Sequence, residues 1–207
     1  MQHNTVGTHY YERNIVDIKT EYTNFFMDIT APLIYEGIKS MHDKAIEYEQ
    51  HVLRLMKENP RVKNPGLIEI FQQFLKSTQT WNSNIVETET VRIRDSSKHA
   101  DIFDKLIKAV IKSHIVLLTY NASGKTCRLV NEKIHEKIDV KNLIHKIYIE
   151  CSRRFYIYPN LFDRGHDQII LKQNQDEAIG IIKESIRDAI MKMLPLNDIL
   201  SEYLKND

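Results

Sequence analysis

The most constraining feature of this chain is a pattern of apolar residues that repeats through residues 11–85. Apolar side chains recur there at alternating spacings of four and three residues, in three successive runs. This spacing keeps one narrow stripe on a single side of an α-helix, and the stripe must be buried against another helix. Long helices packed along their lengths are therefore expected. The three runs are Tyr11, Ile15, Ile18, Tyr22, Phe25 and Ile29; Ile34, Ile38, Met41, Ala45, Tyr48, Val52 and Leu55; and Leu67, Phe71, Phe74, Thr78, Trp81 and Ile85.

Capping residues and prolines predict where these helices begin and end. Thr30 is expected to end the first helix and to cap the second, because Pro32 then falls in a first turn, where its missing N–H costs nothing. The second helix should end before Pro60, since the residue before a proline avoids helical geometry. Residues 64–66, Asn-Pro-Gly, restart the pattern, and residues 88–94 are compatible with either a helix or a strand.

The C-terminal part should form a smaller helical subdomain. A fourth helix capped by Ser96 or Ser97 completes an up-and-down bundle over residues 1–119, and the polar, glycine-containing break at residues 119–125 separates it from residues 120–207. The predicted fold class is therefore mainly α. Three later helices are expected, starting after the cap Asp139, at Asn174 with Glu177 as an approximate capping box, and at Pro195.

Composition excludes several classes of protein. The chain has 207 residues, of which 42% are apolar and 28% charged, as in ordinary globular proteins. Its formal charge of +1 does not favour nucleic acid or an anionic membrane as the main partner. The longest apolar run, residues 115–118, is far shorter than the roughly 18–20 residues of a membrane-spanning helix. No secretion signal precedes the first helix, so Cys127 and Cys151 are expected to be free thiols.

Two motifs resemble parts of cofactor sites but lack the rest. Residues 123–126, Ser-Gly-Lys-Thr, match the end of a phosphate-binding P-loop, but that motif needs a glycine where this chain has Thr119. Glu132 and His135 form one Glu-x-x-His half-motif of a di-iron bundle, which requires two such motifs and two further glutamates. We therefore expect no cofactor at either place, and His135 is interpreted as a surface histidine.

Asp163, His166 and Asp167 form the most catalytic-looking cluster of the chain. Carboxylates and an imidazole can bind a metal ion or transfer protons, but the same residues are typical of a solvated loop. No nucleophile or second cluster accompanies them, and Cys151 lies on an apolar helix face, where a cysteine behaves as a small hydrophobe. The chain is therefore expected to have no catalytic residue and no metal site, although an ion at this loop stays open.

The helix predicted after Asp139 carries a basic and aromatic edge. Such an edge can bind nucleic acid through phosphate pairing and base stacking, bind an acidic patch of a protein, or simply form a solvated helix face. Its residues are Lys141, His145, Lys146, Tyr148, Arg153, Arg154 and Tyr156.

Sequence strings in the last third resemble a little-characterised family encoded by nucleocytoplasmic large DNA viruses. The likeness is best over residues 139–204, and the closing segment around residues 185–204 is similar too. The strings that carry it are Ile144-His145-Lys146, Tyr148-Ile149-Glu150, Arg154-Phe155 and Pro159-Asn160-Leu161-Phe162.

This resemblance implies a non-enzymatic structural protein of the virion, present in the host cytoplasm during assembly. It would be a minor capsid or scaffold component whose partners are other capsid proteins, with no small-molecule substrate. Self-association through the N-terminal seam stays open, and the alternative is a nucleic-acid-associated factor that uses the basic edge. Arginine and aromatic residues dominate protein contacts where they cluster, and the same aromatic residues fit a core position equally well. The predicted docking residues are Tyr148, Arg153, Arg154, Phe155, Tyr156, Tyr158, Leu161 and Phe162.

Overall fold

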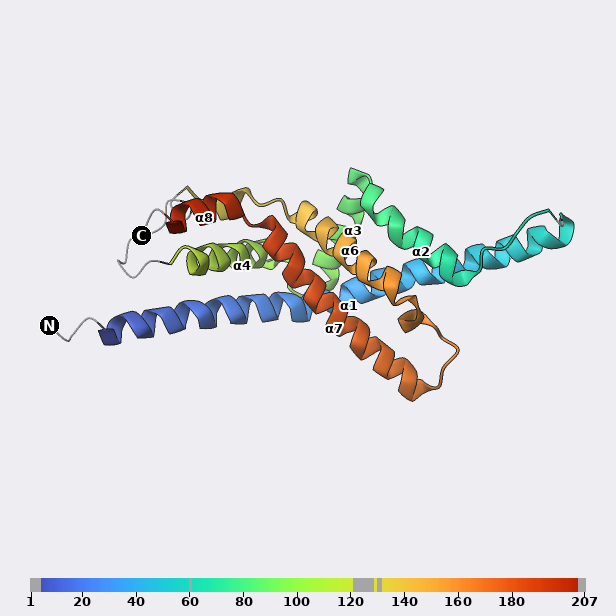
Figure 1. The fold of residues 1–207 in the computed structure, drawn as a ribbon, viewed down its shortest axis with the longest axis horizontal. Helices are drawn as coiled ribbons and strands as arrows, with labels where there is room; N and C mark the ends of the chain where they lie inside the picture. Colours follow the sequence, from blue (N-terminus) through green and yellow to red (C-terminus); the bar gives the residue numbers. More distant parts are fainter. Residues whose placement is uncertain (1–4, 60, 121–128, 130–131, 205–207) are drawn as a thin grey trace.

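The computed structural model is mainly helical over the residues that it describes, which are 5–59, 61–120, 129 and 132–204 (Figure 1). The predicted fold class, a mainly α bundle with smaller C-terminal helices, is confirmed. The α-helices are α1 (Thr5–Glu58), α2 (Leu67–Ser77), α3 (Ser83–Ser96), α4 (Phe103–Leu118), α6 (Val140–Ile157), α7 (Gln168–Met193) and α8 (Leu196–Leu204), and the short 3-10 helices are η1 (Thr78–Thr80), η2 (Ile134–Lys137) and η3 (Pro159–Phe162).

One long helix, α1, takes the place of the first two predicted helices. The predicted break at Thr30 is wrong, because the helix continues through Pro32. A proline inside a helix costs about 3 kcal/mol, but Ala31, Ile34 and Ile38 around it are fully buried. The packing of this segment therefore offsets the cost of the proline. At a rise of 1.5 Å per residue, the 54 residues of α1 span about 80 Å.

The other helices are arranged around α1. In Figure 1, α4 lies along the N-terminal half of α1, and α7 crosses α1 near its middle. The last turns of α1 project beyond the rest of the molecule. Helix α6 packs against α7, α2 and α3. The buried apolar residues form one cluster that runs from Phe26 to Ile199. This core crosses the boundary predicted between residues 1–119 and 120–207, and the division into two subdomains stays a prediction.

Three helix starts predicted from local signals are confirmed. Helix α2 follows the Asn-Pro-Gly sequence, in which Gly66 has a φ of 91° that favours glycine. The Asp139 side chain accepts a hydrogen bond from the backbone N–H of Lys141 at 2.9 Å and caps α6. Helix α8 begins directly after Pro195. Local chemistry alone determines these three positions.

Residues 88–94 belong to α3, which excludes the strand alternative that the sequence left open. The helix start expected at Asn174 is wrong. Helix α7 begins at Gln168 rather than near Asn174, because Asp167 is the better cap. Its carboxylate accepts hydrogen bonds from two backbone N–H groups, those of Ile169 at 2.9 Å and Ile170 at 3.0 Å.

Part of the first predicted seam does not face the core, although Ile15 is buried and Ile29 packs against the core. Ile18, Tyr22 and Phe25 keep 47%, 42% and 37% of their surface exposed. The adjacent side of α1, which includes Phe26 and Met27, is buried instead. The 4–3 spacing therefore correctly predicts a helix in this region but not which of its faces packs inside the chain.

Phe162 of η3 packs against aromatic side chains of α1, α2 and α6. Its ring lies 5.6 Å from that of Tyr35 on α1, 5.4 Å from Phe71 on α2 and 5.0 Å from Phe155 on α6, measured between centroids. It is 4% exposed. Aromatic contacts of this kind stabilise a core beyond the apolar area that they bury.

Replacing Phe162 with alanine should therefore lower the free energy of unfolding by about 3–5 kcal/mol, through lost contacts and a cavity. The neighbouring Tyr158 is 52% exposed, and Tyr158→Ala should change stability by no more than about 0.5 kcal/mol. Urea denaturation of the two variants measures both effects. Equal losses would contradict the placement of Phe162 in the core.

Candidate functional site

Half of the predicted docking residues lie in the core. Tyr148, Phe155, Leu161 and Phe162 are 1%, 0%, 7% and 4% exposed. They cannot form a contact surface in this conformation, so the alternative reading, in which aromatic residues pin the core, holds for these four. The sequence could not separate the two readings because buried and docking aromatics have the same composition.

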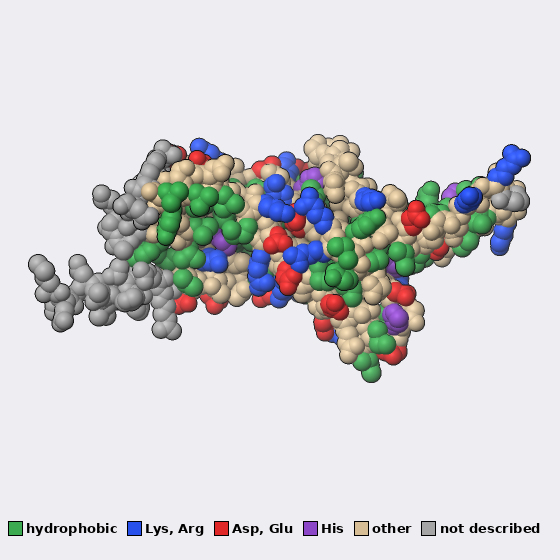
Figure 2. Space-filling model, in the orientation of Figure 1, with side chains coloured by type: hydrophobic (Ala, Val, Ile, Leu, Met, Phe, Trp, Pro, Cys, Tyr) green, Lys and Arg blue, Asp and Glu red, His purple; other side chains and the backbone are tan. Residues whose placement is uncertain are grey.

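The charged docking residues are engaged in ion pairs. Arg154 donates hydrogen bonds to Glu184 at 2.5 Å and to Asp188 at 2.7 Å, both on α7. Arg153 donates to Glu150 of its own helix at 2.7 Å. In Figure 2, acidic side chains are interleaved with the basic ones in the middle of the molecule, where α6 and α7 pack. The basic edge of α6 is therefore largely neutralised within the chain.

The two remaining docking residues lie near the end of α6. Tyr156 is half-buried, with the Lys76 ammonium 4.9 Å from its ring centroid, and Tyr158 is exposed. The structure thus leaves only part of the predicted set accessible, and a docking role for that part stays a prediction.

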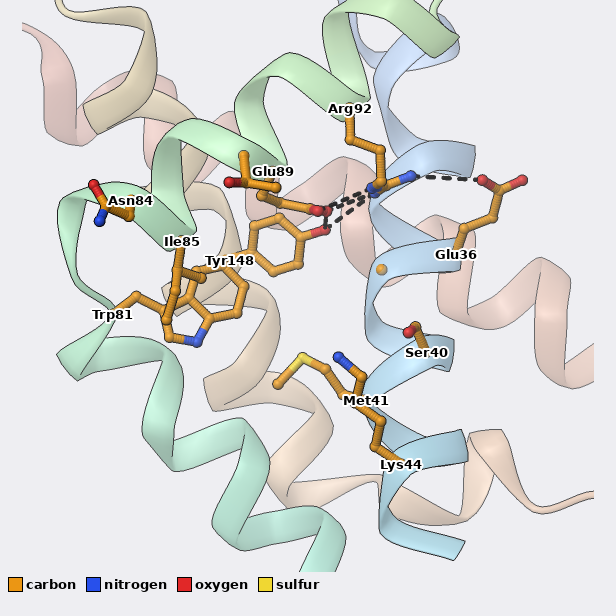
Figure 3. Close-up of a pocket in the computed structure, with 12 residues that line it drawn as sticks. Glu36, Ser40, Met41, Lys44, Trp81, Asn84, Ile85, Glu89, Arg92 and Tyr148 are labelled. Atoms are coloured by element: carbon orange, nitrogen blue, oxygen red, sulfur yellow. Dashed lines mark hydrogen bonds and ion pairs between the residues drawn. The ribbon is translucent and has the colours of Figure 1, made fainter. Parts of the chain in front are cut away.

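A cavity of about 500 Å³ opens between α1 and α3, with Tyr148 of α6 at its floor (Figure 3). This volume lies in the range of small-molecule and side-chain pockets, roughly 300–1,000 Å³. The cavity is lined by the apolar side chains of Met41, Trp81 and Ile85 and by the charged side chain of Lys44. Sequence reasoning did not identify this site, because its residues are spread over three helices.

Three charged or polar side chains at the cavity floor form one network. Arg92 binds the Glu89 carboxylate in a two-pronged arrangement, Nε to Oε2 at 2.9 Å and Nη2 to Oε1 at 2.6 Å. The Tyr148 hydroxyl donates a hydrogen bond to Oε1 of Glu89. Arg92 Nη2 also donates to the backbone carbonyl of Leu33 at 2.7 Å. The network therefore joins α1, α3 and α6 at one point, which Figure 3 shows.

Tyr148 and Arg92 each keep a single protonation state near neutral pH. Burial, followed by the Glu89 charge, raises the pKa of Tyr148 well above its usual value. The hydrogen bonds that Arg92 donates to the Glu89 carboxylate raise the pKa of Arg92. Near neutral pH the phenol is a neutral donor and the guanidinium a cation, so neither group is poised to exchange a proton. This arrangement locks three helices and is poorly suited to acid–base chemistry.

The hydrogen-bonded network of Tyr148, Glu89 and Arg92, which we call the lock, requires the glycine at position 37 of α1. A Cβ atom at this position would overlap the Tyr148 hydroxyl and approach Glu89 Oε1 to 2.9 Å. A glycine in the middle of a helix costs roughly 0.5–1 kcal/mol relative to alanine. The helix carries that cost here because only glycine lets the phenol reach its partners beside the α1 backbone.

The Asp163–Asp167 loop does not form a ligand cluster. Asp167 caps α7, Asp163 accepts a hydrogen bond from the Gly165 backbone at 2.9 Å, and His166 Nε2 lies 3.6 Å from Asp163. Within the described residues, no three His, Cys, Asp or Glu side chains converge in a way that could hold a metal ion. Two of the three residues therefore have local structural roles.

The remaining sequence candidates have mixed outcomes. Cys151 is fully buried, and burial raises the pKa of its thiol to about 12, so its predicted character as a small hydrophobe is confirmed. His135 is also buried, so its assignment as a surface histidine is wrong. The cause is η2, which packs this residue against α4. The P-loop-like residues 123–126 and Cys127 lie outside the described residues.

Gly37→Ala should lower the free energy of unfolding by about 1–3 kcal/mol, because the added methyl group overpacks the Tyr148 contact. Gly180 on α7 is the matched control, since a Cβ there meets nothing within 4 Å. Gly180→Ala should instead stabilise the chain by roughly 0.5–1 kcal/mol through helix propensity. Chemical denaturation gives both values.

A double-mutant cycle makes this test specific to the lock. In a Tyr148→Phe background the overlapping hydroxyl is gone, so the cost of Gly37→Ala should fall by at least about 1 kcal/mol. An unchanged cost in that background would show that Gly37 is required for some other reason.

Comparison with known proteins gives one match. A family model described as "Family of unknown function (DUF5764)" matches residues 13–163, which is more than half of the chain. No match was found among curated proteins or among solved structures. Among the described residues, no helix is both long and apolar enough to cross a membrane. The match begins at residue 13 within α1, ends directly after η3 and includes Gly37, Glu89, Arg92 and Tyr148. The chain therefore belongs to this family of unknown function.

Proposed function

We propose that this chain is a non-enzymatic structural protein that holds two partner surfaces a fixed distance apart, as a minor capsid or scaffold component of a virus particle. The observation that carries the proposal is α1, a single helix about 80 Å long with α2, α3, α4 and α7 packed on it. A helix braced in this way resists bending and suits a spacer.

Exposed apolar side chains at the two extremities support this role. Toward the projecting end of α1, Tyr48 and Leu53 are 51% and 44% exposed. At the opposite end of the molecule, Leu200 and Leu204 on α8 are 56% and 67% exposed (Figure 1). Apolar side chains that gather on a protein surface commonly mark contacts with other proteins. The proposed partner surfaces are these two ends.

The assignment to a virus particle depends on the sequence strings of residues 144–162. Those strings resemble a family of large nucleocytoplasmic DNA viruses, and the matched family model covers the same segment. The neutralised basic edge of α6 disfavours the alternative, a nucleic-acid-associated factor, because Arg153 and Arg154 are already paired with carboxylates.

Cross-linking mass spectrometry on purified particles from the source tests the proposal. Exposed lysines report on each extremity, Lys57 on the projecting end of α1 and Lys192 beside α8. The expected result is a set of reproducible cross-links from Lys57 to one capsid protein and from Lys192 to a different one. Lys183 lies in the middle of the molecule, serves as the internal control and should link mainly within the chain. Its pairing with Asp28 at 2.6 Å is matched by that of Lys192 with Glu150 at 2.7 Å, so the two lysines differ in position.

Two outcomes would overturn the proposal. Absence of the chain from particles, with recovery from cell lysate in a nuclease-sensitive complex, would favour the nucleic-acid alternative. Cross-links from one end only, with the other end free, would contradict the spacer role.

A further inference from the structure

Part of the first apolar seam remains at the surface, although Phe25 contacts the ring of His99, with centroids 5.1 Å apart, and Ile29 packs against the core. Ile18, Tyr22, Phe25 and the half-buried Ile29 follow one another at spacings of four, three and four residues along α1. We call these four residues the apolar stripe. The face of α1 next to the stripe packs against α4, so the stripe itself remains at the surface. A stripe with this period is the type that packs against another helix.

The stripe borders a hollow between α1 and α4. This groove has a volume of about 490 Å³, and Ile18 and Tyr22 line one wall. Ala109, Lys112 and Val116 of α4 line the other wall at spacings of three and four residues. Both walls of the groove therefore have the residue spacing of helix-packing surfaces. Two further helices can pack against such a pair and complete a four-helix bundle.

Opposite charges flank the two sides of the groove. On α1, the exposed Asp17 and Glu21 lie beside the stripe. On α4, Lys112 lines the groove, and the exposed Lys105 lies two turns earlier on the same helix. A twofold axis parallel to the helices sets the acidic edge of one copy against the basic edge of a second copy. The charges of this face are therefore self-complementary.

Helices α1 and α4 are antiparallel, and Asp17 and Lys112 lie at the same level along their axes. The Phe26 and Phe103 rings are neighbours, with centroids 6.0 Å apart. Asp17 precedes Phe26 by nine residues, and Lys112 follows Phe103 by nine, so the two lie at the same level along the pair. A twofold axis parallel to the helices keeps that level and would set Asp17 of one copy against Lys112 of the other.

We propose that the apolar stripe and the α1–α4 groove are occupied by the same face of a second copy of this chain, which forms a symmetric four-helix interface. Tyr22 lies at the centre of that interface, and pairs of Asp17 with Lys112 close its two edges. This inference concerns the purified chain alone and does not depend on the proposed role in a virus particle.

Sedimentation equilibrium of the full chain tests this interface. The expected mass is twice the 24.4 kDa of one chain at concentrations up to about 100 µM, where micromolar association is visible. Tyr22→Lys should raise the dimer Kd at least about tenfold, because it places a charge in the apolar centre. Ile169→Lys is the control, since Ile169 is 73% exposed at the start of α7 and lies outside the groove. It should leave the Kd unchanged.

A charge swap tests the twofold geometry. Asp17→Lys and Lys112→Asp should each raise the Kd by about threefold to tenfold, because each change acts at two symmetric edges. The double variant restores opposite charges and should return the Kd to within about threefold of the wild-type value. Circular dichroism checks that each variant is helical. A monomer at all concentrations, a dimer insensitive to Tyr22→Lys, or a double variant weaker than both singles would each overturn the proposal.

Discussion

The structure depends on the continuity of α1 through its middle, where a proline would ordinarily end a helix. Ala31, Ile34 and Ile38 are fully buried there, and α7 crosses at the same place. The apolar area removed from water around Pro32 outweighs one lost backbone hydrogen bond. If the helix broke, α4 and α2 would no longer be held on one axis, and the length proposed for the spacer would be lost.

The Tyr148–Glu89–Arg92 lock joins α3 and α6 to this axis. It is a fully partnered polar network at the edge of an apolar core, and such networks specify one arrangement of helices more strongly than apolar contacts do. Gly37 shows that the sequence of α1 is fitted to it, since the phenol lies where any Cβ would be. The cavity beside the lock lies between α1 and α3, with Tyr148 at its floor (Figure 3).

The sequence predicts local features well and the choice between faces poorly. Asp139 and Pro195 act on their own turn of helix, so their roles can be read without the fold. Pro32 carries an equally clear local signal, but packing overrides it. For Tyr22 and Phe162, periodicity and residue type indicate a contact without saying whether it lies within the chain or outside it. The structure buries Phe162 and exposes Tyr22, the reverse of what the docking and seam hypotheses assigned to them.

The most direct test of the account is a distance along α1 across Pro32. Spin labels at Thr20 and Lys44, both exposed, can be introduced as cysteines after Cys127 and Cys151 are replaced by alanine. Dilution with unlabelled chain removes distances between copies, and double electron–electron resonance then measures the separation within one chain. A continuous helix predicts one narrow distribution near about 35 Å. A broad distribution, or one below about 20 Å as in a hairpin broken at Thr30, would contradict the central claim.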